Sequence, residues 1–312
     1  MNESSPAARR RFLQTIAFGA AGLCASPLGW SDDAVDSTAQ PWLRKTLKVG
    51  MLGKQGTLAE RFAKAKQAGF EGVELNVPGI DVDDAKAAAA ATGIILDGTV
   101  GGYHWQQRHS DPDPKVRQTA LSKLKQGIEE TAAVGADTML LVPAHGNDGT
   151  EAEVYERAMA AVREAIPVAE ANGVSILIEN VWNHFLYQHD GPSDQTADAL
   201  ASFIDAFDSP WVGVQFDIGN HWKYGNPADW IRTLDHRIKK LDIKGFSRAE
   251  DKFTKITEGD IDWPSVETAL HDIGFTGWLA AEVAGGDLDR LREINDHMEE
   301  SLHCSQSLSR VN

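Results

Sequence analysis

From residue 47 onward, short apolar runs rich in β-branched residues alternate with longer stretches rich in Ala, Lys and Glu. Runs of the first kind predict buried parallel strands, and stretches of the second kind predict helices that cover them. We expect eight strands, at Leu47–Met51, Gly72–Leu75, Ile94–Val100, Thr138–Val142, Val174–Glu179, Val212–Asp217, Ile238–Lys244 and Trp278–Glu282. Helices are expected at Leu58–Ala68, Asp83–Ala91, Pro114–Val134, Glu151–Ala171, Thr196–Phe207, Pro227–Leu234, Trp263–His271 and Leu288–Leu302.

Several turns place a glycine just beyond a predicted helix, as at Gly69, Gly135, Gly173 and Gly274. Glycine suits this position because it adopts the left-handed conformation that ends a helix. Eight strand–helix units in a chain of 312 residues favour an α/β protein with a single (β/α)8 TIM barrel. No GxGxxG follows the first strand, which disfavours a dinucleotide-binding sheet. We expect the barrel over residues 46–303 and a C-terminal tail over 304–312.

The N-terminus predicts a targeting segment. Arg9-Arg10-Arg11-Phe12-Leu13 resembles a twin-arginine export signal, and a moderately apolar run from Ile16 to Leu28 follows it. That run is too short and too weakly apolar for a stable membrane span. We expect residues 1–30 to direct export to the periplasm and residues 31–45 to form a flexible lead-in.

Composition narrows the function further. The formal net charge is −16, whereas binding to nucleic acid requires a basic surface. The two cysteines, Cys24 and Cys304, exclude a disulfide framework and a thiolate-rich zinc site. A small-molecule partner is therefore expected, with a homo-oligomer left open.

Three predicted strands end in a carboxylate: Glu179, Asp217 and Glu282. The carboxyl ends of barrel strands gather at one rim, where active sites of this fold lie. A carboxylate at the end of a buried apolar run is costly unless it is paired or bound to a cation. The sequence therefore predicts a metal-binding or acid–base site at this rim.

The motifs around these residues resemble the xylose isomerase-like sugar isomerase/epimerase family, across nearly all of residues 46–303. They are Ile178-Glu179-Asn180-Val181-Trp182-Asn183, Phe216-Asp217-Ile218-Gly219-Asn220, Ile238-Lys239-Lys240-Leu241-Asp242-Ile243-Lys244-Gly245, Gly259-Asp260-Ile261-Asp262-Trp263 and Ala281-Glu282-Val283. The resemblance implies a divalent metal that holds a sugar by adjacent oxygens. It also implies that Glu179 and Glu282 are metal ligands and the acid–base pair, and that Asp217 is a ligand.

The chain departs from the family pattern on the seventh strand. Asp242 stands where the family has a histidine ligand, and Gly245 stands where it has an aspartate. Asp242 as an oxygen ligand would complete a Glu/Asp/Asp/Glu set, which suits Mg²⁺, Mn²⁺ or Ca²⁺ better than Zn²⁺. We expect Mn²⁺ or Mg²⁺. The alternative is that metal binding is weakened or lost.

Other polar and aromatic residues near the predicted strand ends are candidates for substrate contact. Histidines there can hold hydroxyl groups, tryptophans can stack on a sugar face, and a lysine can neutralise an oxyanion. These candidates are Glu74, His104, Trp105, His145, Trp182, His184, His221 and Lys244.

The reading these features favour is a metal-dependent isomerase or epimerase of carbohydrate metabolism. It would act on a sugar or keto-sugar by moving a proton next to a carbonyl. One alternative is a lyase or hydratase that uses the same proton abstraction on a 3-keto-glycoside. Another is a sugar-binding barrel without catalysis. An apurinic-site nuclease shares the fold, but the acidic charge disfavours it.

Overall fold

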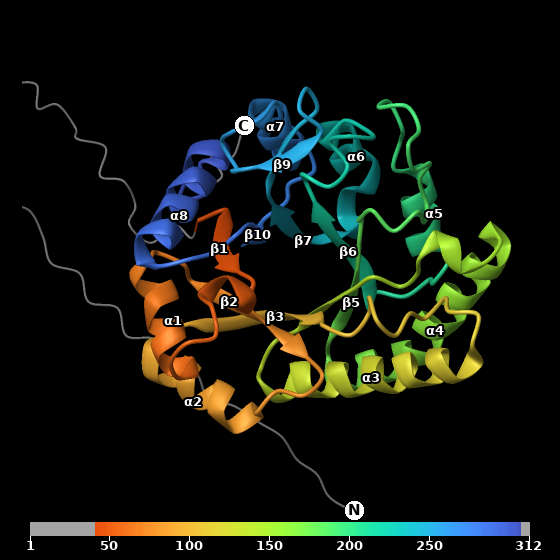
Figure 1. Ribbon diagram of the computed structural model, residues 1–312, viewed down its shortest axis with the longest axis horizontal. Helices are drawn as coiled ribbons and strands as arrows, with labels where there is room; N and C mark the ends of the chain where they lie inside the picture. Colours follow the sequence, from red (N-terminus) through yellow and green to blue (C-terminus); the bar gives the residue numbers. More distant parts are fainter. Residues whose placement is uncertain (1–40, 307–312) are drawn as a thin grey trace, which may run out of the picture. The chain divides into compact units, whose positions relative to one another are not determined.

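The computed structural model describes residues 41–306. Eight parallel strands form a nearly closed ring in the order β1-β10-β7-β6-β5-β4-β3-β2, which confirms the single (β/α)8 barrel (Figure 1). A parallel bridge between Lys48 and Glu74 joins β1 to β2. The strands are β1 (Leu43–Leu47), β2 (Gly72–Val77), β3 (Ile95–Gly101), β4 (Thr138–Leu141), β5 (Ser175–Glu179), β6 (Val212–Asp217), β7 (Ile238–Ile243) and β10 (Gly277–Ala281).

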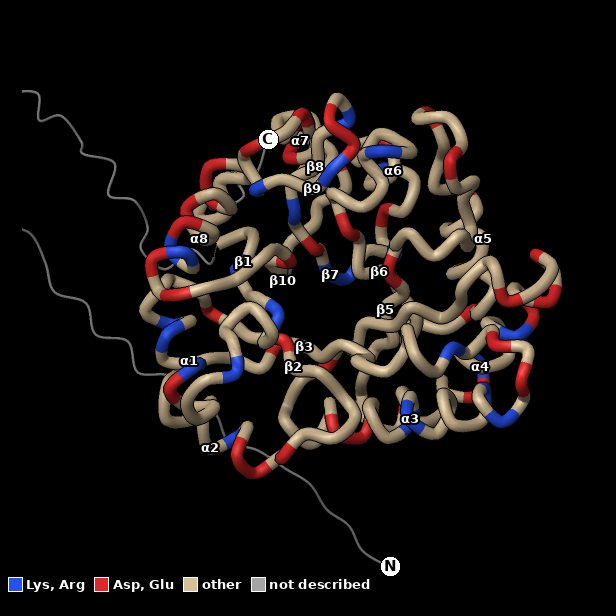
Figure 2. The backbone as a smooth tube through the Cα atoms, in the orientation of Figure 1, with Lys and Arg blue, Asp and Glu red and all other residues tan. Residues whose placement is uncertain are grey.

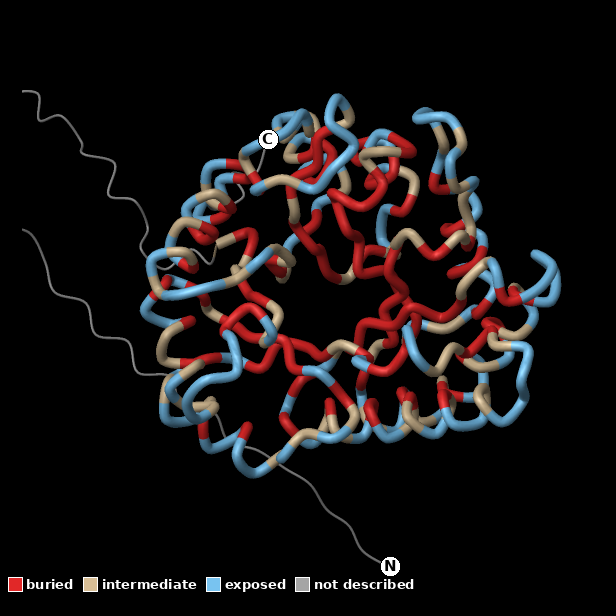
Figure 3. The backbone as a smooth tube through the Cα atoms, viewed as in Figure 1, coloured by how far each residue is buried: buried red, intermediate tan, exposed pale blue. Residues whose placement is uncertain are grey.

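Helices surround the strands, whose backbone is mostly buried, and turn their exposed faces to solvent (Figure 3). Local sequence sets their ends. The longest helix, for example, begins at a capping box between Thr150 and Glu153 and ends at Gly173, whose φ is 66°. The helices are α1 (Leu58–Gln67), α2 (Val82–Thr92), α3 (Pro114–Ala133), α4 (Glu151–Asn172), α5 (Asp198–Asp205), α6 (Pro227–Leu234), α7 (Trp263–Asp272) and α8 (Leu288–Leu302).

The first strand lies earlier in the chain than expected. β1 spans Leu43–Leu47 and pairs with β10, whereas Val49–Leu52 forms a short 3-10 helix. The prediction of a strand at Leu47–Met51 was therefore wrong, because the run after Leu47 is apolar but belongs to the turn. The start of the barrel moves accordingly into the predicted lead-in.

The two ends of the described chain lie together. Backbone hydrogen bonds join Leu43 to Cys304 (3.4 Å) and Trp42 to Gln306 (3.1 Å). Residues 304–306 of the predicted tail thus pack beside β1. The predicted export signal of residues 1–30 lies outside the described residues.

A small antiparallel hairpin follows β7 and was not predicted. It pairs β8 (Gly245–Ser247) with β9 (Lys252–Thr254). The hairpin lengthens the connection between β7 and α7 on the side of the barrel where the strands end. Among the described helices, none combines the length and the apolar character that a membrane crossing requires.

Candidate active site

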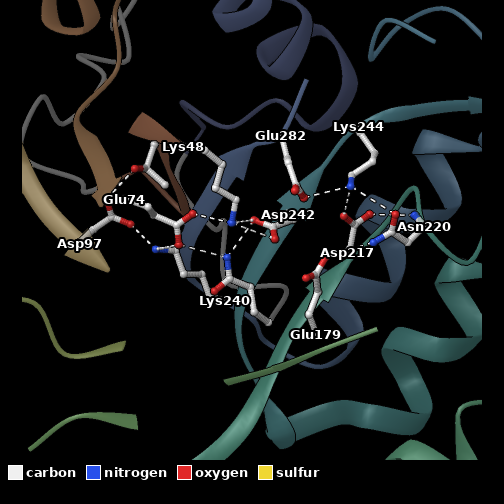
Figure 4. A network of polar contacts seen from close by, with 12 residues as sticks. Lys48, Glu74, Asp97, Glu179, Asp217, Asn220, Lys240, Asp242, Lys244 and Glu282 are labelled. Carbon is white, nitrogen blue, oxygen red and sulfur yellow. Dashed lines mark hydrogen bonds and ion pairs between the residues drawn. The ribbon is translucent and has the colours of Figure 1, made fainter. Parts of the chain in front are cut away.

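Four carboxylates from four strands meet inside the rim of the barrel (Figure 4). One oxygen from each lies within 4.8 Å of the others; the residues are Glu179, Asp217, Asp242 and Glu282. Asp217 and Asp242 face each other in the register of β6 and β7. Glu179 ends β5, and Glu282 directly follows β10. The structure therefore brings together the four residues that the sequence singled out.

The turn after β6 fixes two of these carboxylates. Asp217 Oδ1 accepts hydrogen bonds from the backbone N–H of Gly219 (2.9 Å) and of Asn220 (2.8 Å). The side chain of Asn220 donates to Glu179 Oε1 at 3.1 Å. Asn180 accepts the backbone N–H of Asp217 at 2.7 Å. The Asp-x-Gly-Asn and Glu-Asn sequences thus orient one another across β5 and β6.

Lys244 lies against the same cluster. Its Nζ is 2.7 Å from Asp217 Oδ2 and 2.9 Å from Glu282 Oε2. Gly219 permits this approach, because a Cβ at that position would lie 2.7 Å from the backbone oxygen of Lys244. Lys244 was expected to face the site, and it pairs with Asp217 and Glu282 rather than with Asp242.

Asp242 is tied to the inside of the barrel. Lys48 Nζ lies 2.9 Å from Asp242 Oδ1 and 2.6 Å from Glu74 Oε2. Gln215 Nε2 donates to Asp242 Oδ1 at 2.8 Å and to Glu74 Oε1 at 3.1 Å. Asp242 therefore joins the carboxylate cluster to a second polar layer beneath it.

The deeper layer consists of charged side chains that form ion pairs inside the barrel. Lys240 Nζ lies 2.6 Å from Glu74 and also pairs with Asp97. Gly98 leaves room for this ammonium group, because a Cβ there would lie 2.7 Å from Lys240 Nζ. Glu74 is only 1 % exposed. Lys48, Lys240 and Gln215 all contact its carboxylate, and the contact of Glu74 with substrate stays a prediction. The charged positions on the strands can be followed in Figure 2.

The buried network has fewer positive than negative groups: three lysines face six carboxylates (Figure 4). Burial and the neighbouring Glu282 raise the pKa of Glu179 well above its usual value. Burial raises the pKa of Asp217 to about 6 and that of Asp242 to about 7, despite the nearby lysines. Burial also opposes ionisation of Glu282, but Lys244 and Lys48 outweigh it and lower its pKa. The cluster lacks positive charge, which an added cation would supply.

The donor set fits such a cation. Two oxygens on opposite sides of Mg²⁺ lie about 4.2 Å apart, and around Ca²⁺ about 5 Å, so oxygens within 4.8 Å of one another are close enough to share one such cation. Asp217 Oδ2 and Glu282 Oε2 are buried without a hydrogen-bond partner among residues 41–306, and each forms an ion pair with Lys244. Four carboxylates are the ligands of a hard divalent cation rather than of a soft one.

Two of the predicted histidines lie in packed interiors. His104 Nδ1 accepts the backbone N–H of Val142 at 3.2 Å, and burial lowers the pKa of His104 to about 3. His221 is 3 % exposed, lies 3.2 Å from Asn180 Nδ2 and packs against Trp230. Burial also lowers the pKa of His221 to about 3. Both rings are neutral, and neither belongs to the carboxylate cluster.

The other two predicted histidines lie in the outer loops, where the rings of His145 and His184 are 5.3 Å apart. Trp105 is 42 % exposed and meets His104 edge-on. Trp182 donates its indole N–H to the backbone oxygen of Asn220. These residues lie in the loops that follow β3, β4 and β5, and their contact with substrate stays a prediction.

Sequence reasoning missed Lys48, Gln215, Asn220, Lys240 and Asp97. Gln215 and Lys240 lie two residues before Asp217 and Asp242, so strand alternation points them to the same face. Their polarity within apolar strands was the available signal. Lys48 was hidden by the misplaced first strand, because it was assigned to the strand itself rather than to its carboxyl end.

A protein-family model described as the xylose isomerase-like TIM barrel matches residues 62–307, so the chain belongs to this family. Among curated proteins, the chain is 24 % identical over 177 residues to an uncharacterized protein of Methanocaldococcus jannaschii. That match covers 54 % of this chain and 58 % of the relative, which is less than two thirds of its length. The chain is also 26 % identical over 247 residues to the D-psicose 3-epimerase of Ruminiclostridium cellulolyticum, covering 72 % and 77 % of the two proteins.

Solved structures share the fold. An L-ribulose 3-epimerase superposes with a TM-score of 0.71 and 17 % identity, covering 84 % of this chain and 95 % of that one. The 3-keto-D-glucoside 4-epimerase of E. coli superposes with a TM-score of 0.69 and 18 % identity, covering 84 % and 100 %. A third structure, the IOLI protein with a bound zinc atom, has a TM-score of 0.66, 14 % identity and coverage of 85 % and 100 %. The curated relative from R. cellulolyticum and two of these solved structures are named as sugar epimerases.

Proposed function

We propose that the protein is a metal-dependent isomerase or epimerase that moves a proton next to the carbonyl of a sugar or keto-sugar. The observation that carries this proposal is the convergence of Glu179 and Glu282 within one carboxylate cluster. β6 and β7 lie between their strands in the sheet, so the two side chains approach the cluster from different sides. A substrate held between them would expose one carbon to both carboxylates, as two-base epimerisation or proton relay requires.

The same cluster is the proposed metal site. Glu179, Asp217, Asp242 and Glu282 would hold a divalent cation, with Mn²⁺ or Mg²⁺ favoured by four carboxylate ligands. Such a cation supplies stabilisation of negative charge on the sugar oxygens. The ammonium group of Lys244, beside Asp217 and Glu282, adds a fixed positive charge on the same side. Asn220 holds the carboxylate of Glu179 in place.

The proposal is tested by metal analysis of the purified protein and by deuterium exchange from solvent into a panel of ketoses and 3-keto-glucosides. We expect Glu179→Gln and Glu282→Gln each to lower exchange by roughly 10²–10⁴-fold, the usual contribution of a positioned acid or base. Glu170→Gln, an exposed position on α4, is the matched control and should retain exchange. Product analysis separates epimerisation from elimination, because only elimination releases the aglycone of a keto-glucoside. Absence of both bound metal and exchange in every sugar would refute the proposal.

A further inference from the structure

A cavity of about 620 Å³ opens directly beside the carboxylate cluster. Lys244 and Glu282 line it, so the cavity reaches the cluster at Glu282 and at the lysine that pairs with this residue. Its outer wall comes from the β8–β9 hairpin and from the loop that leads from β10 into α8. The volume lies within the roughly 300–1,000 Å³ that is typical of small-molecule sites.

Phe253, on the hairpin, gives this cavity an aromatic face. Its side chain is 46 % exposed, although it belongs to an aromatic cluster. The ring centroids of Trp182 and Phe246 lie 5.0 Å and 5.3 Å from that of Phe253. Lys244 Nζ lies 5.4 Å from the same centroid. An exposed ring that is supported by neighbouring aromatic rings offers a flat apolar surface next to the polar groups of the site.

The charged residues around this ring are already neutralised. Lys255 and Arg290 both pair with Glu293, at 2.7 Å and 2.6 Å, and Lys255 also lies 3.6 Å from Glu258. Lys252 pairs with Glu250 at 2.6 Å, so three cations face three carboxylates. A wall of paired charges offers hydrogen-bond donors and acceptors but little net attraction for a phosphate. Hydroxyl groups on one edge and a C–H face on the other, as in a pyranose ring, match such a wall and Phe253.

We propose that this cavity is a second subsite, which binds the second unit of a glycoside or disaccharide. The ring that carries the carbonyl would lie over Glu179 and Glu282, and the neighbouring unit would stack on Phe253. This inference rests on the proposed function, because the reacting ring needs the carboxylate cluster. It assigns the substrate to glycosides rather than to free monosaccharides.

The test measures binding of four unmodified sugars by isothermal titration calorimetry: glucose, methyl β-glucoside, cellobiose and maltose. We expect cellobiose or maltose to bind at least tenfold more tightly than both glucose and the methyl glucoside. Phe253→Ala should remove that advantage, whereas Phe253→Trp should keep it. Ile95→Ala is the matched control, because Ile95 is also a large exposed apolar residue, at the start of β3 away from the strand ends.

Two outcomes would overturn the inference: disaccharides that bind no more tightly than glucose, or an advantage that persists in a folded Phe253→Ala protein. Circular dichroism of each variant checks that it is folded. Failure of the proposed function has a different signature. Deuterium exchange would then be absent from every sugar, while the Phe253-dependent preference for disaccharides would remain.

Discussion

The ammonium group of Lys48 lies between two buried carboxylates, 2.9 Å from Asp242 and 2.6 Å from Glu74. Lys48 directly follows β1, Glu74 belongs to β2 and Asp242 to β7, so this one side chain links three strands. The barrel is joined between β1 and β2 by the bridge from Lys48 to Glu74. Lys48 therefore supports both the closure of the barrel and the orientation of Asp242.

Replacement of Lys48 by methionine should destabilise the protein strongly. Removing one partner of a buried ion pair leaves an uncompensated charge, which costs about 3–5 kcal/mol of folding free energy. Urea denaturation monitored by tryptophan fluorescence measures the loss. Lys54→Met, at an exposed position nearby, is the control and should change stability by less than about 0.5 kcal/mol. A Lys48→Met protein as stable as the control would show that the pair contributes nothing.

Asp242→Ala tests whether Asp242 is the fourth ligand of the proposed cation. If Asp242 binds the cation, we expect the affinity for Mn²⁺ to fall at least tenfold, since one of four carboxylate ligands is lost. Asp242→His, which restores the histidine of the family pattern, should shift preference from Mn²⁺ toward Zn²⁺. Calorimetric titration with each metal gives both numbers. Unchanged affinity in both variants would limit the ligands to Glu179, Asp217 and Glu282.

Lys244→Gln should change metal affinity and turnover in opposite directions. The ammonium group lies 2.7 Å and 2.9 Å from oxygens of two proposed ligands, so it repels a cation placed among them. We expect the variant to bind Mn²⁺ at least tenfold more tightly and to turn over more slowly, because a positive charge beside the sugar oxygens is lost. Titration and deuterium exchange on the same preparation provide the comparison. Weaker Mn²⁺ binding would mean that Lys244 orients the ligands rather than competing with the cation.

Because His221 is buried, the free energy of unfolding should depend on pH in the acidic range. Burial lowers the pKa of His221 to about 3 in the folded chain, whereas the unfolded chain protonates near pH 6.5. Between these values the unfolded state binds more protons, so stability falls as the pH falls, by up to about 1.4 kcal/mol per pH unit. His221→Gln removes this contribution, and its free energy of unfolding should fall less than that of the wild type between pH 6 and pH 4. Parallel curves for the two proteins would contradict the assignment.

We propose that residues 1–30 act as a twin-arginine export signal. Fusion of residues 1–45 to a reporter that is active only after export in the folded state should give periplasmic activity. Replacing Arg9, Arg10 and Arg11 by lysine together should abolish it, because such a signal requires its arginine pair. Export that persists in the lysine variant, or that requires an unfolded reporter, would point to a different route.

The strands that carry the site could be predicted because burial on both faces leaves long apolar runs in which a terminal carboxylate stands out. Glu179, Asp217 and Glu282 were found in this way, and the position of Asp242 came from the order of the motifs. β1 could not be placed, since Leu43–Leu47 has three consecutive polar residues between its two leucines and becomes a strand only by pairing with β10. The hairpin was missed because each of its strands has only three residues, which is too short for a periodic pattern to show.

The partners within the polar interior of the barrel could not be predicted, because they depend on which strands face each other in space. Lys240 and Asp97 are far apart in the chain and become partners only when β7 and β3 face each other across the ring. Packing also determines whether a predicted histidine lies beside the carboxylate cluster. His221 follows a ligand strand closely, yet it packs against Trp230 rather than beside the carboxylates. Spacing along the chain brings a residue to the rim, but neighbours in space decide which way its side chain turns.

Because Glu282 lies near the C-terminus, the carboxylate cluster is completed late in the synthesis of the chain. Glu282 follows β10, which is the last strand of the ring to leave the ribosome and the one that pairs with both β1 and β7. About nine tenths of the chain is synthesised before the residue that completes the cluster. If the cluster binds a cation as proposed, binding would follow the pairing of β10 with β1 and β7 and would come late in biosynthesis.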